Sequence, residues 1–348
     1  MIVLLAAFVT AFLIAFIAIP LVIKYAIQNN LVDIPGRRKI HKQVTPSMGG
    51  IAIFVGLFIS SLIWVNVNNW NEIKFVIAAL TIVFITGLRD DLIPLKPFVK
   101  LGGQVLAATI LVVIYDMRLH SFYGLISGEW PIWISYLVSV FTMIIITNSF
   151  NLIDGLDGLA GLISISSLIA FGSWFFVMND QVYAVLVFAT IGAILAFLRF
   201  NWEPAKIFMG DTGSLVLGLL LSICVIHFIN LNDSLAEDAP MHFEASIATA
   251  CCFIIIPLID TFRIIILRVL KGQSPFKPDK QHIHHALMRL GLSHSKTALV
   301  LAGVQVFFIF MAIMVMKVGG DRILLPALFL LATVFSVMLD RKIIKKVS

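Results

Sequence analysis

The run IVLLAAFVTAFLIAFIAIPLVI, Ile2–Ile23, decides the fold class of this chain. Its 22 residues carry no charge, and a transmembrane helix needs about 20 mostly apolar residues. The first cation, Lys24, follows the run, and the chain lacks the basic start and small-residue cleavage site of a secretory signal. We therefore expect a retained membrane helix.

The composition agrees with this interpretation. Of the 348 residues, 60% are hydrophobic and 13% are charged, whereas soluble domains have about 45–50% apolar and about 25% charged residues. This excludes a soluble globular protein and a disordered one. The net charge of +6 reflects where cations sit relative to a bilayer, so we expect no nucleic-acid partner. The three cysteines lie in apolar runs and form no disulfide or zinc pattern.

Ten more apolar runs predict an all-α polytopic membrane protein with about 11 transmembrane helices. They are Gly49–Val67, Phe75–Leu88, Leu101–Tyr115, Pro131–Thr147, Leu159–Met178, Val182–Leu198, Gly213–Leu231, Ala245–Leu267, Thr297–Met316 and Ile323–Leu339. The largest polar segment, Arg268–Lys296, has about 29 residues and is too small for a core of its own. We therefore expect residues 1–348 to form a single integral membrane domain.

The cations predict the orientation of this bundle. With 11 spans, the two termini lie on opposite sides of the membrane. Of the 25 Lys and Arg residues, 21 fall on one side, and the other side holds Lys74, Arg118, Lys317 and Arg322. The positive-inside rule then places the N-terminus outside and the C-terminus in the cytoplasm.

Five polar clusters fall at the predicted cytoplasmic face. They are Arg89-Asp90-Asp91 with Lys100; Asn148–Gly161, with Asn148, Asn151, Asp154 and Asp157; Phe208–Ser214, with Asp211; Asp260 and Arg263 with Arg268; and Ser274–His285, with His282, His284 and His285.

Taken singly, several clusters have simpler explanations. Asp90-Asp91 would fit an interfacial stop signal, Asp211 a helix N-cap, and Asp260 with Arg263 an ion pair within one helix. The segment Asn148–Gly161 is harder to explain as a topological anchor, because it contains acids and no cation. The histidines lack the thiols or acid that would complete a zinc site, and phosphate or sugar binding suits them better.

Taken together, the clusters predict a metal-assisted phosphoryl-type transfer. Carboxylates and amides without thiols suit a hard ion, and Mg²⁺ commonly bridges substrate phosphates. Lys100, Arg268 and the histidines would supply positive charge. We expect one water-soluble substrate and one membrane lipid. A secondary transporter and a lipid-binding scaffold remain alternatives, although transporters usually place acids near the membrane midplane in repeated halves, and no repeat is visible here.

Four of these motifs together resemble the polyprenyl-phosphate N-acetylhexosamine-1-phosphate transferases, glycosyltransferase family 4. The matching residues are Asp90-Asp91, Asn148–Gly161, Phe208–Ser214 and Ser274–His285, in the family's order. Eleven spans with the N-terminus outside also match the family. Ser274–His285 is similar to the WecA branch, since Ile283 interrupts the three consecutive histidines of the MraY branch.

The resemblance implies transfer of GlcNAc-1-phosphate from UDP-GlcNAc to undecaprenyl phosphate. The products would be UMP and undecaprenyl-diphospho-GlcNAc, which primes O-antigen, enterobacterial common antigen or a related envelope glycan. The enzyme would lie in the bacterial inner membrane with its active site facing the cytoplasm. Another UDP-N-acetylhexosamine, including UDP-MurNAc-pentapeptide, remains an alternative donor. A homodimer is an option that the sequence leaves open.

The resemblance also implies roles for single residues. Asp211 and Asn151 would hold Mg²⁺, with Mn²⁺ as a substitute, and Asp90 would take a proton from the lipid phosphate. The remaining expected catalytic residues are Asp91, Asp154 and Asp157, and the expected substrate-binding residues are Lys100, Asn148, Arg268, His282, His284 and His285. A two-step route through a covalent aspartyl intermediate stays open.

Overall fold

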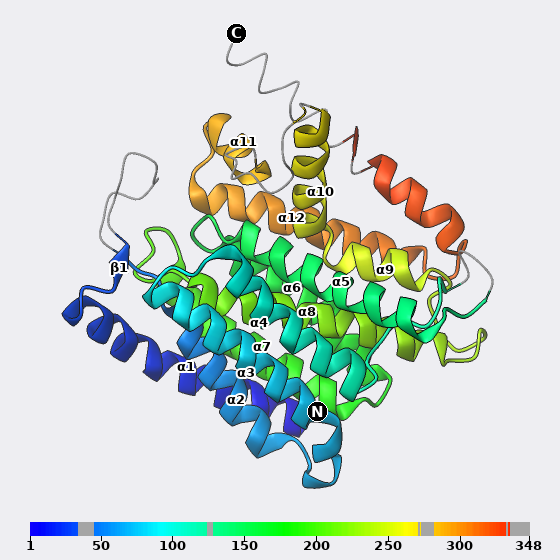
Figure 1. Cartoon of the computed structure of the whole chain (residues 1–348), viewed down its shortest axis with the longest axis horizontal. Helices are drawn as coiled ribbons and strands as arrows, with labels where there is room; N and C mark the ends of the chain where they lie inside the picture. The colour runs from blue at the N-terminus through cyan, green and yellow to red at the C-terminus, as the bar shows by residue number, and fades with distance from the viewer. Residues whose placement is uncertain (34–44, 124–127, 271, 273–281, 332, 335–348) are drawn as a thin grey trace.

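The structure is a computed structural model of the whole chain. It describes all residues except 34–44, 124–127, 271, 273–281, 332 and 335–348, which are drawn as a thin grey trace in Figure 1. The elements, in chain order, are α1 (Ile2–Gln28), β1 (Val32–Asp33), β2 (Thr45–Pro46), α2 (Gly49–Trp64), η1 (Val67–Asn69), α3 (Trp70–Leu92), α4 (Pro97–Thr109), η2 (Ile110–Ile114), α5 (Ile132–Ile153), α6 (Leu159–Val177), α7 (Gln181–Asn201), α8 (Gly210–Asp233), α9 (Ser246–Phe253), α10 (Ile255–Leu270), α11 (Ile283–Arg289) and α12 (His294–Met314). Residues 321–331 are also helical.

The all-α fold class is confirmed. Within the described ranges, eight helices are long and apolar enough to cross a membrane, or nine if α9 and α10 form one bent span. α2 has 16 residues and is shorter than these. Part of the eleventh predicted run lies outside the described residues. The number of 11 spans and their orientation therefore stay predictions.

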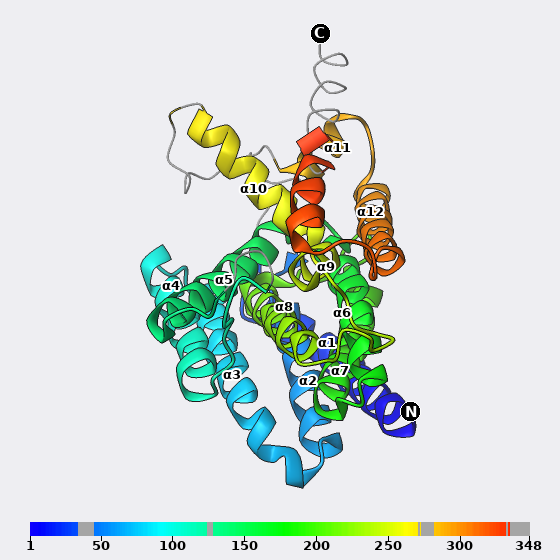
Figure 2. The ribbon, with the colours of Figure 1, turned by 90° about the vertical axis from the view of Figure 1, so that its right-hand side faces the viewer.

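The predicted span Ala245–Leu267 is wrong as a single helix. The chain forms α9 and α10, which meet at a bend of 90° next to Ile254. Pro257, in the first turn of α10, has no N–H to donate to the carbonyl one turn earlier, and proline commonly breaks a helix for this reason. α10 packs against α5 and α12, and its far end projects beyond the main bundle (Figures 1 and 2).

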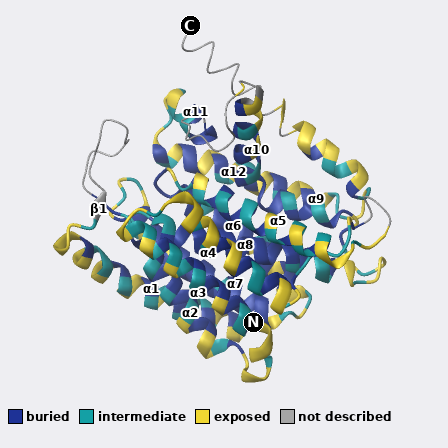
Figure 3. Cartoon of the chain, viewed as in Figure 1, coloured by how far each residue is buried: buried dark blue, intermediate teal, exposed yellow. Residues whose placement is uncertain are grey.

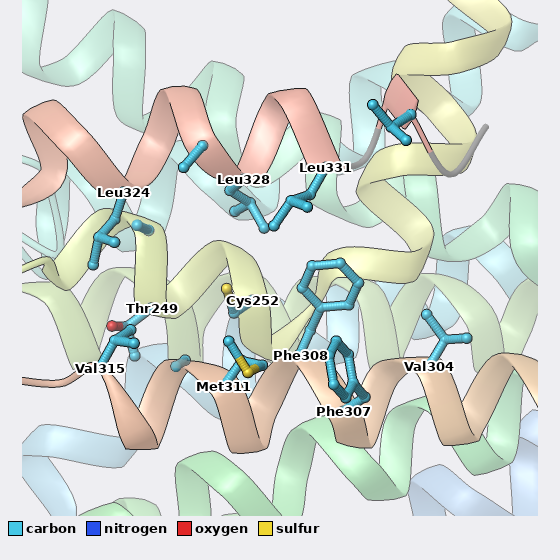
Figure 4. A pocket seen from close by; sticks show the side chains of 14 residues that line it. Thr249, Cys252, Val304, Phe307, Phe308, Met311, Val315, Leu324, Leu328 and Leu331 are labelled. Carbon is cyan, nitrogen blue, oxygen red and sulfur yellow. The ribbon is translucent and has the colours of Figure 1, made fainter. Parts of the chain in front are cut away.

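α7 and α8 form the centre of the bundle. Their apolar side chains are buried nearly all round, whereas α1 leaves one face uncovered, with Leu5, Leu13 and Ile17 exposed (Figure 3). In a bilayer such a face contacts lipid, and the helix satisfies its own backbone groups. An apolar pocket of about 640 Å³ lies between α9, α12 and the segment of residues 324–331, with Val334 also lining it (Figure 4).

The first turn of α8 is fixed by close helix packing. A Cβ added at Gly50 of α2 would lie 2.0 Å from the backbone nitrogen of Gly213, and one at Gly87 of α3 would lie 2.5 Å from the carbonyl oxygen of Asp211. Glycine at both positions lets α2 and α3 approach the α8 backbone. The segment before α8 is held as well, because Phe208 donates its N–H to Pro46 O at 2.7 Å.

Candidate active site

Lys100 brings four helix ends together. It lies in the first turn of α4, which starts at Pro97. Its Nζ is 3.4 Å from Asp90 Oδ2 at the end of α3 and 3.4 Å from Asn151 Oδ1 at the end of α5. It also contacts Asp211 Oδ2 at the start of α8. The side chains of Asp90, Lys100 and Asp211 are 14%, 18% and 27% exposed, so the cluster is open to a ligand.

Asn151 ties α5 to α8. Its Nδ2 donates to Asp211 Oδ1 at 2.5 Å and to Ser214 Oγ at 2.8 Å. One turn earlier, Asn148 donates to Gln104 Oε1 at 2.7 Å, and Gln104 donates back at 3.3 Å. The predicted substrate-binding residue Asn148 therefore also joins α5 to α4, and Gln104 and Ser214 are members of the network that the sequence motifs did not single out.

Asp91 caps α8. Its carboxylate accepts the backbone N–H of Asp211 at 2.8 Å and that of Thr212 at 2.9 Å, and it accepts the Thr212 hydroxyl at 2.5 Å. The residue before α8, Met209, supplies no side-chain cap. Asp211 is therefore no N-cap: its carboxylate is free to face Lys100 and Asn151, because Asp91 satisfies the backbone donors of the first turn.

Asp154 lies directly after α5 beside this cluster. Burial raises the pKa of its carboxyl group to about 8, and the negative charges of Asp211 and Asp91 raise it further. A carboxyl group that exchanges its proton near neutral pH is suited to acid–base work.

Asp157 makes different contacts. It is buried, accepts the N–H of Ala205 at 3.1 Å, and lies 3.4 Å from His294 Nδ1. Beside it, Glu203 accepts the N–H and hydroxyl of Ser295 at 2.8 and 2.7 Å, and these bonds hold the pKa of Glu203 below its ordinary value. These contacts join the loop between α7 and α8 to the start of α12, and no motif in the sequence indicated them.

The histidine cluster lies against the segment between α5 and α6, next to Asp154. A Cβ added at Gly155 would lie 2.8 Å from His284 Nε2, so glycine there allows the close approach. The rings of His284 and His285 have centroids 4.3 Å apart, and His282 stacks against His284. Burial lowers the pKa of His284 to about 3. Residues 274–281 of this motif lie outside the described residues.

Asp260 anchors the histidine cluster to α10. Its carboxylate accepts the N–H of Ile283 at 2.7 Å and lies 2.7 Å from His282 Nδ1. Arg263 and Arg268 follow on the same helix and are largely buried. α10 packs against α5 and α12, so the helix that carries these residues contacts the helix that carries Asn151.

The acid cluster fits a hard divalent cation. Asp90, Asn151 and Asp211 each direct an oxygen at Lys100 Nζ, so oxygen donors already surround a positive charge. Within the described ranges, no three His, Cys, Asp or Glu side chains are close enough to hold a metal alone. A site with few protein oxygens suits Mg²⁺, which keeps several waters and contacts substrate phosphates.

The chain resembles known proteins over the part that contains this cluster. Residues 73–229 match the model of glycosyl transferase family 4, and this range contains Asp90, Lys100, Asn151 and Asp211. The chain is 34% identical over 297 residues to a probable undecaprenyl-phosphate N-acetylglucosaminyl 1-phosphate transferase of Bacillus subtilis, covering 85% of this chain and 80% of the relative.

Two enterobacterial relatives are similar at about the same level. Undecaprenyl-phosphate alpha-N-acetylglucosaminyl 1-phosphate transferase of Salmonella typhi is 33% identical over 313 residues, which is 86% of this chain and 82% of the relative. The protein of that name from Escherichia coli K12 is 33% identical over 285 residues, 80% of this chain and 74% of the relative. The resemblance seen in the motifs is thus confirmed over most of the sequence, and the chain belongs to glycosyl transferase family 4.

Proposed function

We propose that this protein transfers GlcNAc-1-phosphate from UDP-GlcNAc to undecaprenyl phosphate. One observation carries the proposal: Asp90, Lys100, Asn151 and Asp211 come from four helices and meet at one partly exposed cluster. The relatives named above are undecaprenyl-phosphate N-acetylglucosaminyl 1-phosphate transferases, which supports the same substrates here. The products are UMP and undecaprenyl-diphospho-GlcNAc, an intermediate for an envelope glycan.

The reaction must bring two anions together. Two unit charges 4 Å apart repel by about 4 kcal/mol at an effective dielectric constant of about 20, and each reactant carries more than one charge. Lys100 lies among the acids, and its partly exposed ammonium group can contact a phosphate oxygen. Arg268, on α10, and the histidines, of which His284 lies against Gly155, supply further positive charge or hydrogen-bond donors.

Asp90 is the proposed proton acceptor. One of its oxygens is held by the N–H of Leu95 at 2.6 Å, and the other faces Lys100. An oxygen of the lipid phosphate forms a bond to the β-phosphorus of UDP-GlcNAc, and the bond from that phosphorus to the bridging oxygen breaks as UMP leaves. The proton of the lipid phosphate passes to Asp90. Asp91 acts indirectly, because it fixes the first turn of α8 and hence Asp211.

Asp211 and Asn151 are the residues proposed to hold Mg²⁺, for which Mn²⁺ can substitute. When bound, the ion offsets the negative charge of the pyrophosphate and of departing UMP. Asp154 and the histidines are proposed to orient the nucleotide sugar. Asp157 keeps the loop after α7 and the start of α12 in place through Ala205 and His294.

The proposed setting is the bacterial inner membrane, with the acid cluster facing the cytoplasm. The excess of Lys and Arg on that predicted face supports this orientation.

Release of UMP from UDP-GlcNAc by purified protein tests the proposal. We expect release only when both Mg²⁺ and undecaprenyl phosphate are present, with undecaprenyl-diphospho-GlcNAc formed in equal amount. UDP-GalNAc and UDP-MurNAc-pentapeptide serve as competing donors. If UDP-GlcNAc gives no product while another UDP-sugar does, the proposed donor is wrong; if no donor reacts, the transferase assignment itself fails.

A further inference from the structure

The bend between α9 and α10 removes two helical hydrogen bonds. In a continuous helix, the N–H of residue 256 would bond to the carbonyl of Cys252, and that of residue 257 to the carbonyl of Phe253. The bend at Ile254 breaks the first bond, and the second cannot form because residue 257 is proline. Inside a membrane, unpaired backbone groups cost several kcal/mol each.

The side chain of Gln305, on α12, replaces both bonds. Its Oε1 accepts the N–H of Ile256 at 3.1 Å. Its Nε2 donates to Cys252 O at 3.2 Å and to Phe253 O at 2.6 Å. The side chain is fully buried, so water does not serve these groups instead. One amide therefore contacts the last two carbonyls of α9 and one N–H of the first turn of α10 at once.

The start of α9 is held by a second side chain, that of Asp321, the first residue of the helical segment 321–331. Asp321 is buried and accepts the N–H groups of Ile247 and Ala248 at 3.1 and 2.7 Å. Between these two anchors, α9 borders the apolar pocket through Thr249 and Cys252 (Figure 4). Polar contacts therefore hold both ends of α9, in addition to its packing against α12 and α8.

We propose that Gln305 is a positioning residue that sets the direction of α10. α10 carries Asp260, which holds His282 and Ile283, and it carries Arg268 farther along. A change in its direction would move the arginine and histidine side of the site relative to Asp211 and Asn151. Through its contacts at the bend, Gln305 thus influences the residues proposed to bind the nucleotide sugar. The expected effect on substrate binding rests on the proposed function.

Gln305→Met is the direct test, since methionine has similar length and forms none of the three bonds. The matched control is Asn232→Leu. Asn232 is another buried amide, in α8, which accepts the N–H of Phe243 and donates to its carbonyl, both at 2.8 Å. It also loses backbone bonds when replaced, but it lies at the opposite end of the bundle from the acid cluster.

A distance between spin labels reports the direction of α10 without any activity. Labels on noncanonical residues at Ile266 of α10 and Leu137 of α5 would sit on exposed positions. We expect Gln305→Met to shift or broaden the distance distribution, and Asn232→Leu to leave it at that of the unsubstituted protein. An unchanged distribution in folded Gln305→Met protein would overturn the proposal. Should that variant not assemble, Gln305→Asn, which withdraws the amide by one carbon, must show the shift instead.

Kinetics test the consequence for the site. In Gln305→Met we expect KM for UDP-GlcNAc to rise about tenfold, which corresponds to about 1.4 kcal/mol of lost positioning, while the half-saturating Mg²⁺ concentration stays unchanged. The same rise in Asn232→Leu would mean general loosening and would overturn the positioning role. If the distance shifts but even the unsubstituted protein releases no UMP, the proposed function fails and the role of Gln305 in setting the bend stands.

Discussion

Asp91, the last but one residue of α3, accepts the backbone N–H of Asp211 at 2.8 Å and so holds the first turn of α8 from outside that helix. Its neighbour Asp90 faces Lys100 instead. Two adjacent acids therefore have separate tasks: Asp91 fixes where Asp211 stands, and Asp90 belongs to the open cluster. The division follows from the α8 backbone, whose free N–H groups need an acceptor.

Asp91→Asn should lower both stability and activity. Asparagine has one acceptor oxygen where aspartate uses two, and loss of a cap costs about 1 kcal/mol. We expect a lower Tm in detergent together with slower UMP release. Asp90→Asn is the control, because its amide oxygen can keep the bond from Leu95: UMP release should fall while Tm stays unchanged. Equal losses of Tm in the two variants would contradict the assignment of a structural role to Asp91 and a catalytic role to Asp90.

Asp211→Asn should abolish most turnover in a folded protein. The substitution removes the negative charge that faces Lys100 and is proposed to hold Mg²⁺, and electrostatic contacts of this kind are worth about a hundredfold or more in rate. The protein should still fold, because the asparagine oxygen can accept the Asn151 amide as Asp211 does. Tm should fall only moderately, since what is lost is the attraction between this carboxylate and Lys100. Activity like that of the unsubstituted protein, measured as UMP release across Mg²⁺ concentrations, would reject the metal role.

The sequence was sufficient to predict the helical class and the meeting of distant motifs. Apolar runs in lipid must become helices, because only then are backbone groups satisfied, and loops on one side of a bundle can converge. The motif residues Asp90, Lys100, Asn151 and Asp211 indeed contact one another.

Contacts that depend on tertiary packing could not be predicted in this way. The run Ala245–Leu267 reads as one span by composition, and only Pro257 hinted at the bend. Nothing in the spacing of Asp91 or Asp157 indicated that the first would cap α8 or that the second would contact Ala205 and His294. These partners lie far along the chain, and local pattern carries no information about them.

Gly210→Ala should disrupt the site through the backbone. Gly210 has a φ of +70°, and an added Cβ would lie 2.2 Å from Ser47 O and 2.5 Å from Asp91 Oδ2. Both the left-handed conformation and the clash oppose alanine, and we expect a loss of about 1–3 kcal/mol of stability with a matching loss of activity. Thermal unfolding and UMP release measure the two effects.

Gly303→Ala is the matched control for this substitution. Gly303 lies in α12, and a Cβ added there meets no atom within 4 Å. Alanine should be neutral or stabilise the helix by up to about 1 kcal/mol. If Gly210→Ala is tolerated as well as Gly303→Ala, the first turn of α8 is not held as rigidly as the structure indicates.

Arg268→Ala should weaken the use of UDP-GlcNAc more than that of Mg²⁺. A charge-assisted hydrogen bond contributes about 1.5–3 kcal/mol, so KM for UDP-GlcNAc should rise by about tenfold or more. Arg199→Ala serves as control, because Arg199 is an exposed cation in the last turn of α7. A shift in the Mg²⁺ optimum alone, with KM for the sugar nucleotide unchanged, would contradict the assignment of Arg268 to the substrate.

His284 should make the fold sensitive to acid. Burial lowers its pKa in the folded protein to about 3, with His285, His282 and His294 adding to this and Asp260 opposing it, whereas the ordinary value is 6.5. Between pH 6.5 and pH 3, His284 is therefore protonated in the unfolded chain and neutral in the folded protein. As a result, His284 leaves the free energy of unfolding unchanged above about pH 6.5 and lowers it as pH falls from 6.5 toward 3. The loss between pH 7.5 and pH 5.5 is about 1.4 kcal/mol.

His284→Gln isolates this contribution, since glutamine does not titrate. Unfolding in detergent at pH 7.5 and 5.5 should show a loss of stability in the unsubstituted protein that exceeds the loss in the variant by about 1.4 kcal/mol, whatever other groups titrate in both. The variant is expected to be the less stable of the two at pH 7.5, with the gap closing in acid. Parallel losses would mean that His284 accepts its proton in the folded state, and its close contact with Gly155 would then belong to a more open loop.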